Sequence, residues 1–132
     1  WAIEHPHDHF LLYGTPVPGY IAPQDTVVSG TRVTLALAAI VRDASDAGRL
    51  GAVHDDGSGA LVPPLRDELA DLMTSIALTA TVESALAFIS AWSQMFGLIA
   101  FELTNQTRGV VEHHEALFLA TVRSTARRIG LR

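Results

Sequence analysis

The 132-residue sequence contains no cysteine. Disulfide bonds, thiolate zinc sites and cysteine nucleophiles are therefore excluded, and the compartment that we expect is the reducing cytoplasm. Lysine is also absent, so the nine basic residues are all arginine, and the formal net charge is −5. An acidic chain lacks the attraction to phosphate that dominates nucleic-acid affinity, so we expect these residues to bind no DNA by themselves.

Catalytic signatures are missing as well. No serine lies in a recognisable nucleophile motif. Residues 57–59 (GSG) are too short for a phosphate-binding loop and lead into no strand–helix unit. His113 and His114 are adjacent and would point about 100° apart on a helix, so they do not converge on a metal ion. The cluster at residues 54–56 (HDD) lies in a glycine-rich stretch typical of a solvated loop. We predict no catalytic residue and no cofactor.

Three further histidines near the start of the chain could bind a metal ion. His5 and His9 would share one face of a helix, as zinc ligands at i and i+4 do. Pro6 interrupts that helix, and His7 would point elsewhere. We expect polar, surface-facing histidines at a helix junction and predict no metal site.

The longest apolar stretch spans residues 84–101 and contains no charged side chain. Its length is close to the minimum for a membrane span. Four polar residues dilute its hydrophobicity, Glu83 and Glu102 bracket it, and no arginine lies next to either end. We therefore predict no membrane association and interpret the stretch as a soluble helix that is apolar on all sides. Such a helix must be covered on every side, and a second copy of the chain is the expected cover.

Two faces of this helix differ in side-chain size. One is bulky and suits a core, and it comprises Phe88, Trp92, Phe96, Ile99 and Leu103. The opposite face is mixed, and Gly97 in mid-helix allows another backbone to approach closely. The last helix carries a similar line of mostly small residues. The predicted homodimer interface comprises Ser90, Gln94, Gly97, Leu98, Phe101, Leu117, Ala120, Thr121, Ser124 and Arg128.

Helical periodicity recurs along the rest of the chain, and no segment is typical of a strand. We expect helices at residues 7–13, from 25 or 29 to 47, and at 63–76, 81–107 and 112–129, with histidines 5, 7 and 9 at the first junction. The predicted helix that ends at residue 47 carries an apolar stripe, which comprises Val33, Leu37, Ile40, Val41 and Ala44. The prediction is a single all-α domain, residues 1–132, built as a helical bundle whose last two helices form a four-helix dimer interface.

Residues 91–103 (AWSQMFGLIAFEL) resemble the Trp, Gly and Glu-Leu positions of one C-terminal-domain class in the tetracycline-repressor (TetR/AcrR) family of bacterial regulators. Residues 113–118 (HHEALF) and 128–131 (RIGL) resemble its terminal helix, and residues 1–6 (WAIEHP) and 12–20 (LYGTPVPGY) its helix end and proline-rich loop. Phe96 departs from the class, which often has histidine there. The resemblance implies a helical domain that binds a small effector and dimerises through its last two helices. Operator DNA would be bound only by an N-terminal helix-turn-helix domain, absent from this chain.

Large side chains from separate helices are candidates for the effector pocket, because pockets in bundles are mostly apolar with few polar anchors. We predict that a small apolar or aromatic effector binds near His5, Phe10, Tyr13, Leu37, Met73, Ile76, Trp92 and Phe96. Of these, Tyr13, Trp92 and His5 are the expected polar handles. Two alternatives remain open: a metal-binding or enzymatic bundle that uses the histidines, and a dimerisation module without a ligand.

Overall fold

The computed structural model describes residues 1–14, 18–19, 21, 23, 26–51, 53, 61–77 and 80–132. The helices in these ranges are α1 (Pro6–Tyr13), α2 (Val27–Gly30), α3 (Arg32–Asp46), α4 (Pro63–Ser75), α5 (Val82–Leu103) and α6 (His114–Ile129). The same ranges contain no strand, and their β-type pairing is an isolated bridge between Leu50 and Leu131. The all-α class predicted from the sequence is confirmed.

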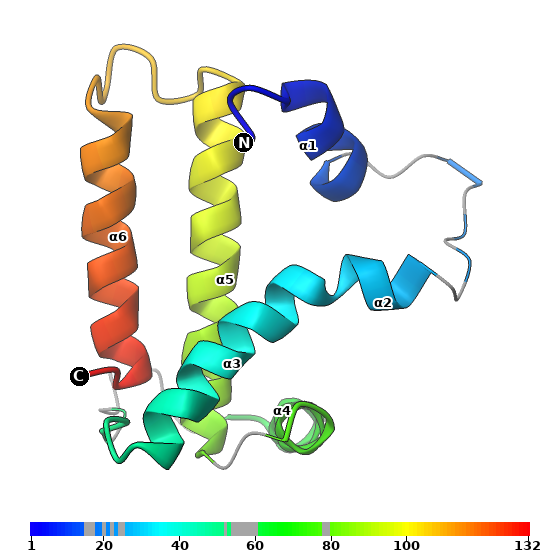
Figure 1. Ribbon diagram of the computed structural model, residues 1–132, viewed down its shortest axis with the longest axis vertical. Coiled ribbons are helices and arrows are strands. Elements are labelled where there is room, and N and C mark those ends of the chain that lie inside the picture. The colour runs from blue at the N-terminus through cyan, green and yellow to red at the C-terminus, as the bar shows by residue number, and fades with distance from the viewer. Residues whose placement is uncertain are drawn as a thin grey trace.

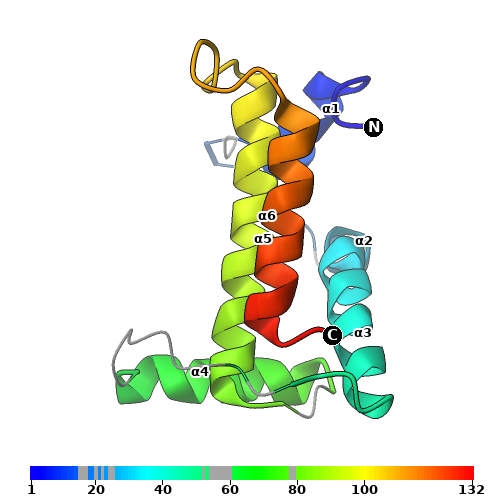
Figure 2. The same ribbon diagram turned by 90° about the vertical axis from the view of Figure 1, so that its left-hand side faces the viewer.

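Helices α5 and α6 lie side by side and antiparallel, and they form the long axis of the molecule (Figure 1). Helix α3 crosses the lower half of α5 obliquely (Figure 1), and α4 runs across the foot of α5 (Figure 2). Helix α1 lies near the upper end of α5. Within one chain, α6 therefore lies along most of α5, whereas α3 and α4 cover its first half and α1 lies near its other end.

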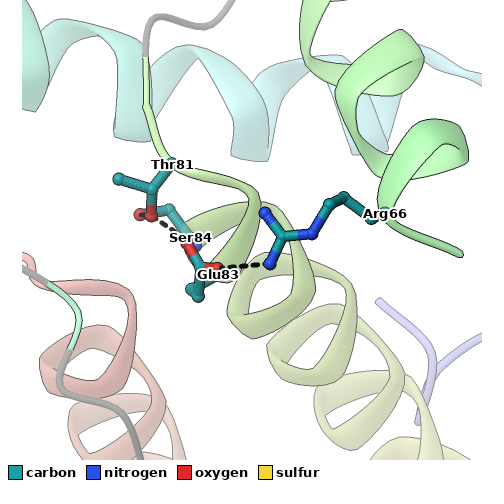
Figure 3. A network of polar contacts seen from close by, with 4 residues as sticks. All are labelled: Arg66, Thr81, Glu83 and Ser84. Atoms are coloured by element: carbon teal, nitrogen blue, oxygen red, sulfur yellow. Dashed lines mark hydrogen bonds and ion pairs between the residues drawn. The ribbon is translucent and has the colours of Figure 1, made fainter. Parts of the chain in front are cut away.

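Helix α5 begins at a well-formed cap (Figure 3). The Thr81 hydroxyl accepts a hydrogen bond from the Ser84 backbone N–H at 3.2 Å, which satisfies one of the free amides of the first turn. Arg66 of α4 lies 3.5 Å from the Glu83 carboxylate. Hydrogen bonding by the backbone and by Thr81, together with the Arg66 charge, lowers the pKa of Glu83 from its usual value. The cap thus also links α4 to α5.

Two predicted helix bounds are wrong. The expected helix ending at residue 47 is divided into α2 and α3 by a turn at Thr31, directly after Gly30, the residue type that most disfavours a helix apart from proline. Helix α5 ends at Leu103 rather than residue 107. Thr104 caps it by donating from its hydroxyl to the Ala100 carbonyl, and Asn105 then takes a left-handed conformation with φ of 56°.

Two clusters of buried residues form the core. The first joins α3, α5 and α6 and comprises Ala38, Val41, Phe88, Ala91 and Ile129, and the second joins α4 and α5 and comprises Leu69, Met73 and Ala85. The stripe predicted on α3 is partly wrong, because Val33 is 41% and Ile40 is 56% exposed. Ala38 is buried in the first cluster instead, at 3% exposed.

The ends of α3 and α6 are tied together by backbone hydrogen bonds. The Gly51 N–H donates to the Gly130 carbonyl at 2.7 Å, and the Arg132 N–H donates to the Arg49 carbonyl at 3.1 Å. Gly130 ends α6 in a left-handed conformation with φ of 96°, and a side chain there would collide with the Gly51 carbonyl. This tie fixes one end of the space between α3 and α6.

Candidate functional site: an apolar cavity between α3, α5 and α6

An apolar cavity of about 150 Å³ lies where α3 crosses the α5–α6 pair. A cavity of about 150 Å³ engineered into another protein and lined by leucine, isoleucine and phenylalanine stays dry and binds benzene. This space is therefore large enough for a small aromatic molecule. Its lining residues are Leu37, Ile40 and Val41 of α3, Phe88, Ala91, Trp92 and Met95 of α5, Val122, Thr125, Ala126 and Ile129 of α6, and Leu131.

The side chains around the cavity carry no ionisable group. Its polar side chains are Thr125 and Trp92. The Thr125 hydroxyl donates within its own helix, to the Thr121 and Val122 carbonyls, each at 3.0 Å. The indole Nε1–H of Trp92 is buried and has no hydrogen-bond partner among the described residues. The wall of the cavity is therefore almost entirely apolar, and the unpaired indole nitrogen is buried beneath the accessible surface.

An aromatic cluster adjoins the cavity and joins α1 to α5. The Trp92 ring meets Phe96 edge-on with ring centroids 5.9 Å apart, and Phe96 in turn meets Tyr13 at 4.8 Å. His9 lies against Tyr13 at 5.4 Å and stacks on Phe96 at 6.5 Å. Edge-on and offset pairs at these separations are favourable. A chain of ring contacts thus connects the cavity wall to the first helix.

The burial of His9 corrects the expectation of three surface-facing histidines, because its side chain is only 4% exposed. Its place on α1 turns it toward α5, where Phe96 covers it. His7 is exposed, as expected, and so is His5, which stacks on Trp1 and lies 3.6 Å from Asp8. The described residues contain no group of three metal-ligating side chains, and residues 54–56 lie outside them. His113 and His114 do not form a pair either, since the His114 ring contacts Thr107 at 3.2 Å.

The eight residues predicted to bind the effector do not form a single group. Leu37 and Trp92 line the cavity, and Phe10, Tyr13 and Phe96 belong to the adjoining aromatic cluster. Met73 lies in the α4–α5 core, Ile76 packs against the α3–α5–α6 core, and His5 is exposed near the N-terminus. The other ten cavity residues were not selected from the sequence. Among them, Ile40 and Val41 were predicted as part of the apolar stripe of the helix that ends at residue 47, and Phe88 as part of the bulky face of the long apolar helix.

The face of the α5–α6 pair predicted to dimerise is uncovered in the single chain. None of its ten residues is fully buried, and Phe101 is 52% exposed. A Cβ atom added at Gly97 would meet no other atom within 4 Å. Among the described helices, α5 alone is long and apolar enough to cross a membrane, and only 22% of its most apolar window is buried. An apolar helix with this little cover needs a further apolar partner.

The fold defines a class: an all-α domain in which an antiparallel helix pair carries an apolar cavity beneath a crossing helix. The chain belongs to the family described as "Tetracyclin repressor-like, C-terminal domain", whose pattern matches residues 1–125, and the resemblance found in the sequence is thereby confirmed. Domains of this family are parts of soluble regulators, which favours a protein partner over a membrane for α5. No curated protein matches the chain.

Proposed function

We propose that the chain is the effector-binding and dimerisation domain of a transcriptional regulator. A small apolar effector binds in the cavity between α3, α5 and α6, and α5 and α6 pair with those of a second copy. The observation that carries this proposal is the cavity itself, because its wall is apolar and it lies between helices of a regulator domain. DNA would be bound by a separate N-terminal domain of the same protein.

The aromatic cluster supports a route by which the effector could act. Contact with Trp92 would reach Phe96 and then Tyr13 and His9 of α1. A ligand shifts an equilibrium only by the difference in its affinity for the two states. An effector that needs the cavity open would therefore favour the arrangement of α3 and α5 that keeps it open.

The effector site is tested by filling the cavity. Ala126 lines the cavity, whereas Ala70 on α4 is exposed and does not line it, so Ala126→Leu and Ala70→Leu form a matched pair. Saturating indane, a neutral bicyclic hydrocarbon, should raise the melting temperature of the wild type, since a ligand at 100 times its Kd stabilises by about 2.7 kcal/mol. Ala70→Leu should respond equally and Ala126→Leu should not. An unchanged response in Ala126→Leu would place binding elsewhere.

The dimer is tested by a bulky substitution on its proposed face. Ala120 is exposed on α6, and tryptophan there should prevent a partner from packing. Ala70→Trp adds the same side chain at an exposed site on α4. Light scattering should give a dimer for the wild type and Ala70→Trp, and a monomer or aggregate for Ala120→Trp. A monomeric wild type at micromolar concentration would refute the proposed interface.

A further inference from the structure

The cavity between α3, α5 and α6 is only partly enclosed. Its inner wall is buried, as the lining residues Val41, Phe88 and Ile129 are. Ile40 of α3 also lines the cavity, yet it is 56% exposed, and Val122 of α6 is half-buried. The burial of the lining therefore falls toward Ile40, and the cavity meets solvent beside this residue.

The inner wall offers little to a polar ligand atom. None of the lining side chains is ionisable. The hydrogen of the Thr125 hydroxyl is donated to carbonyls of its own helix, and the indole nitrogen of Trp92 is buried beneath the accessible surface. A polar or charged atom inside the cavity would lose its water without gaining a partner, which is unfavourable. The part of a ligand that fills the cavity is therefore hydrocarbon.

An apolar row leads away from the opening along α3. Val33 precedes Ile40 by seven residues, or two helical turns, so the two residues share one face of the helix. Val33 is partly exposed as well. Leu37 lies between them on the same side and lines the cavity. A chain that leaves the cavity past Ile40 thus finds about 10 Å of apolar surface along α3.

We propose that the effector is an amphiphile. A small hydrocarbon ring or alkyl end fills the cavity, an alkyl chain leaves past Ile40 and lies along α3, and a polar end group stays in water. This assignment rests on the proposed effector-binding function and adds to it the class of ligand. The cavity selects the buried end by size, and Ile40 selects for chain length, because only a ligand long enough to pass Ile40 packs against it.

The place of the polar end is tested with two pairs of phenylalkyl probes. Phenethyl alcohol and phenethylamine have a two-carbon chain, phenylhexanol and phenylhexylamine have a six-carbon chain, and each carries its hydroxyl or amine at the far end. Both amines are protonated at neutral pH. Calorimetry gives the affinity ratio of alcohol to ammonium at each length, in which the contributions of ring and chain cancel.

The short pair should differ at least about ten-fold in affinity, because its end group must enter the cavity and the charge has no partner there. The long pair should differ less than about three-fold, since both end groups lie in water. A large ratio at both lengths would overturn the amphiphile class and leave the effector site standing. Ratios near one at both lengths would also overturn it, because the short ammonium would then lie outside the cavity. Failure of both alcohols to bind overturns it too, and the response to indane decides separately on the effector site.

Ile40→Ala tests the path of the chain. Leu35 is another largely exposed residue of α3, at 48%, but it does not line the cavity, so Leu35→Ala is the control. Ile40→Ala should lower the affinity ratio of phenylhexanol to phenethyl alcohol about five-fold, because the longer chain alone packs against Ile40. Leu35→Ala should leave this ratio unchanged. Since Ile40 is exposed, its truncation should leave the core intact. An unchanged ratio in Ile40→Ala would show that the chain does not pass Ile40 and would overturn the assigned path.

Discussion

Replacing Gly97 by alanine should separate the stability of one subunit from the stability of the proposed dimer. Gly97 lies in the middle of α5, where glycine costs about 1 kcal/mol relative to alanine. The added methyl group would meet no atom of its own chain within 4 Å. The isolated subunit should therefore gain about 1 kcal/mol, a factor of about five in its ratio of folded to unfolded molecules.

The same substitution should weaken the association of the two subunits in the proposed dimer. In a two-fold symmetric interface the Gly97 positions of both subunits lie on the shared surface. If the partner backbone packs against them, each methyl group must displace it, and overpacking of this kind costs about 1–3 kcal/mol. Gly97→Ala should thus raise the dissociation constant of the dimer by about ten-fold or more, with every 1.4 kcal/mol equal to a factor of about ten.

The assay is thermal unfolding across a dilution series, combined with sedimentation to measure dimer dissociation. At high dilution Gly97→Ala should melt a few degrees above the wild type, and at high concentration this advantage should shrink or reverse. Ala70→Gly at an exposed position of α4 is the control, with a loss of about 1 kcal/mol that does not depend on concentration. A gain for Gly97→Ala at every concentration, with unchanged dimer dissociation, would refute a close contact at Gly97.

Three other outcomes are expected. Phe96→Ala should speed amide hydrogen exchange in α1 while α6 stays protected, because Phe96 holds His9 and Tyr13 through ring contacts, and unchanged exchange in α1 would contradict that role. Glu83→Gln should destabilise at neutral pH. The folded-state pKa of Glu83 is lowered from 4.5, so its contribution is present above that pH and lost as the pH falls through the folded value. Urea titrations should show the two proteins converging in acid, and a constant difference would contradict this. Residues 1–132 should show no tight, salt-sensitive binding to duplex DNA in a mobility-shift assay.

Local patterns in the sequence account for most of the helices. The bulky face of α5 was predicted correctly in Phe88, which is 3% exposed, because side-chain periodicity is a property of neighbouring residues. The helix break at Thr31 was missed, although Gly30, directly before it, is a residue type that disfavours a helix. His9 was assigned to the surface on its polarity, but it is buried and stacks on Phe96 of α5, a helix that lies far away in the sequence.

The residues that form the candidate site were harder to predict, because they depend on how the helices pack in the tertiary structure. Trp92 was selected from the sequence as a large apolar ring with a donor, and the structure adds that this donor is unpaired. Met73 was selected by the same reasoning, yet it fills the α4–α5 core. Size and polarity identify which residues can line a pocket, but they do not specify which helices converge.

The sequence by itself determined the all-α class, the family and the presence of one helix too apolar to be left uncovered. These depend on composition and on a period of about 3.6 residues, both of which are local. The tertiary structure decided where space remains. A cavity is the small difference between the volume enclosed by α3, α5 and α6 and the volume of the side chains that fill it. The crossing of α3 over α5 and the tie between Gly51 and Gly130 set that difference, and both join residues that lie far apart in the chain.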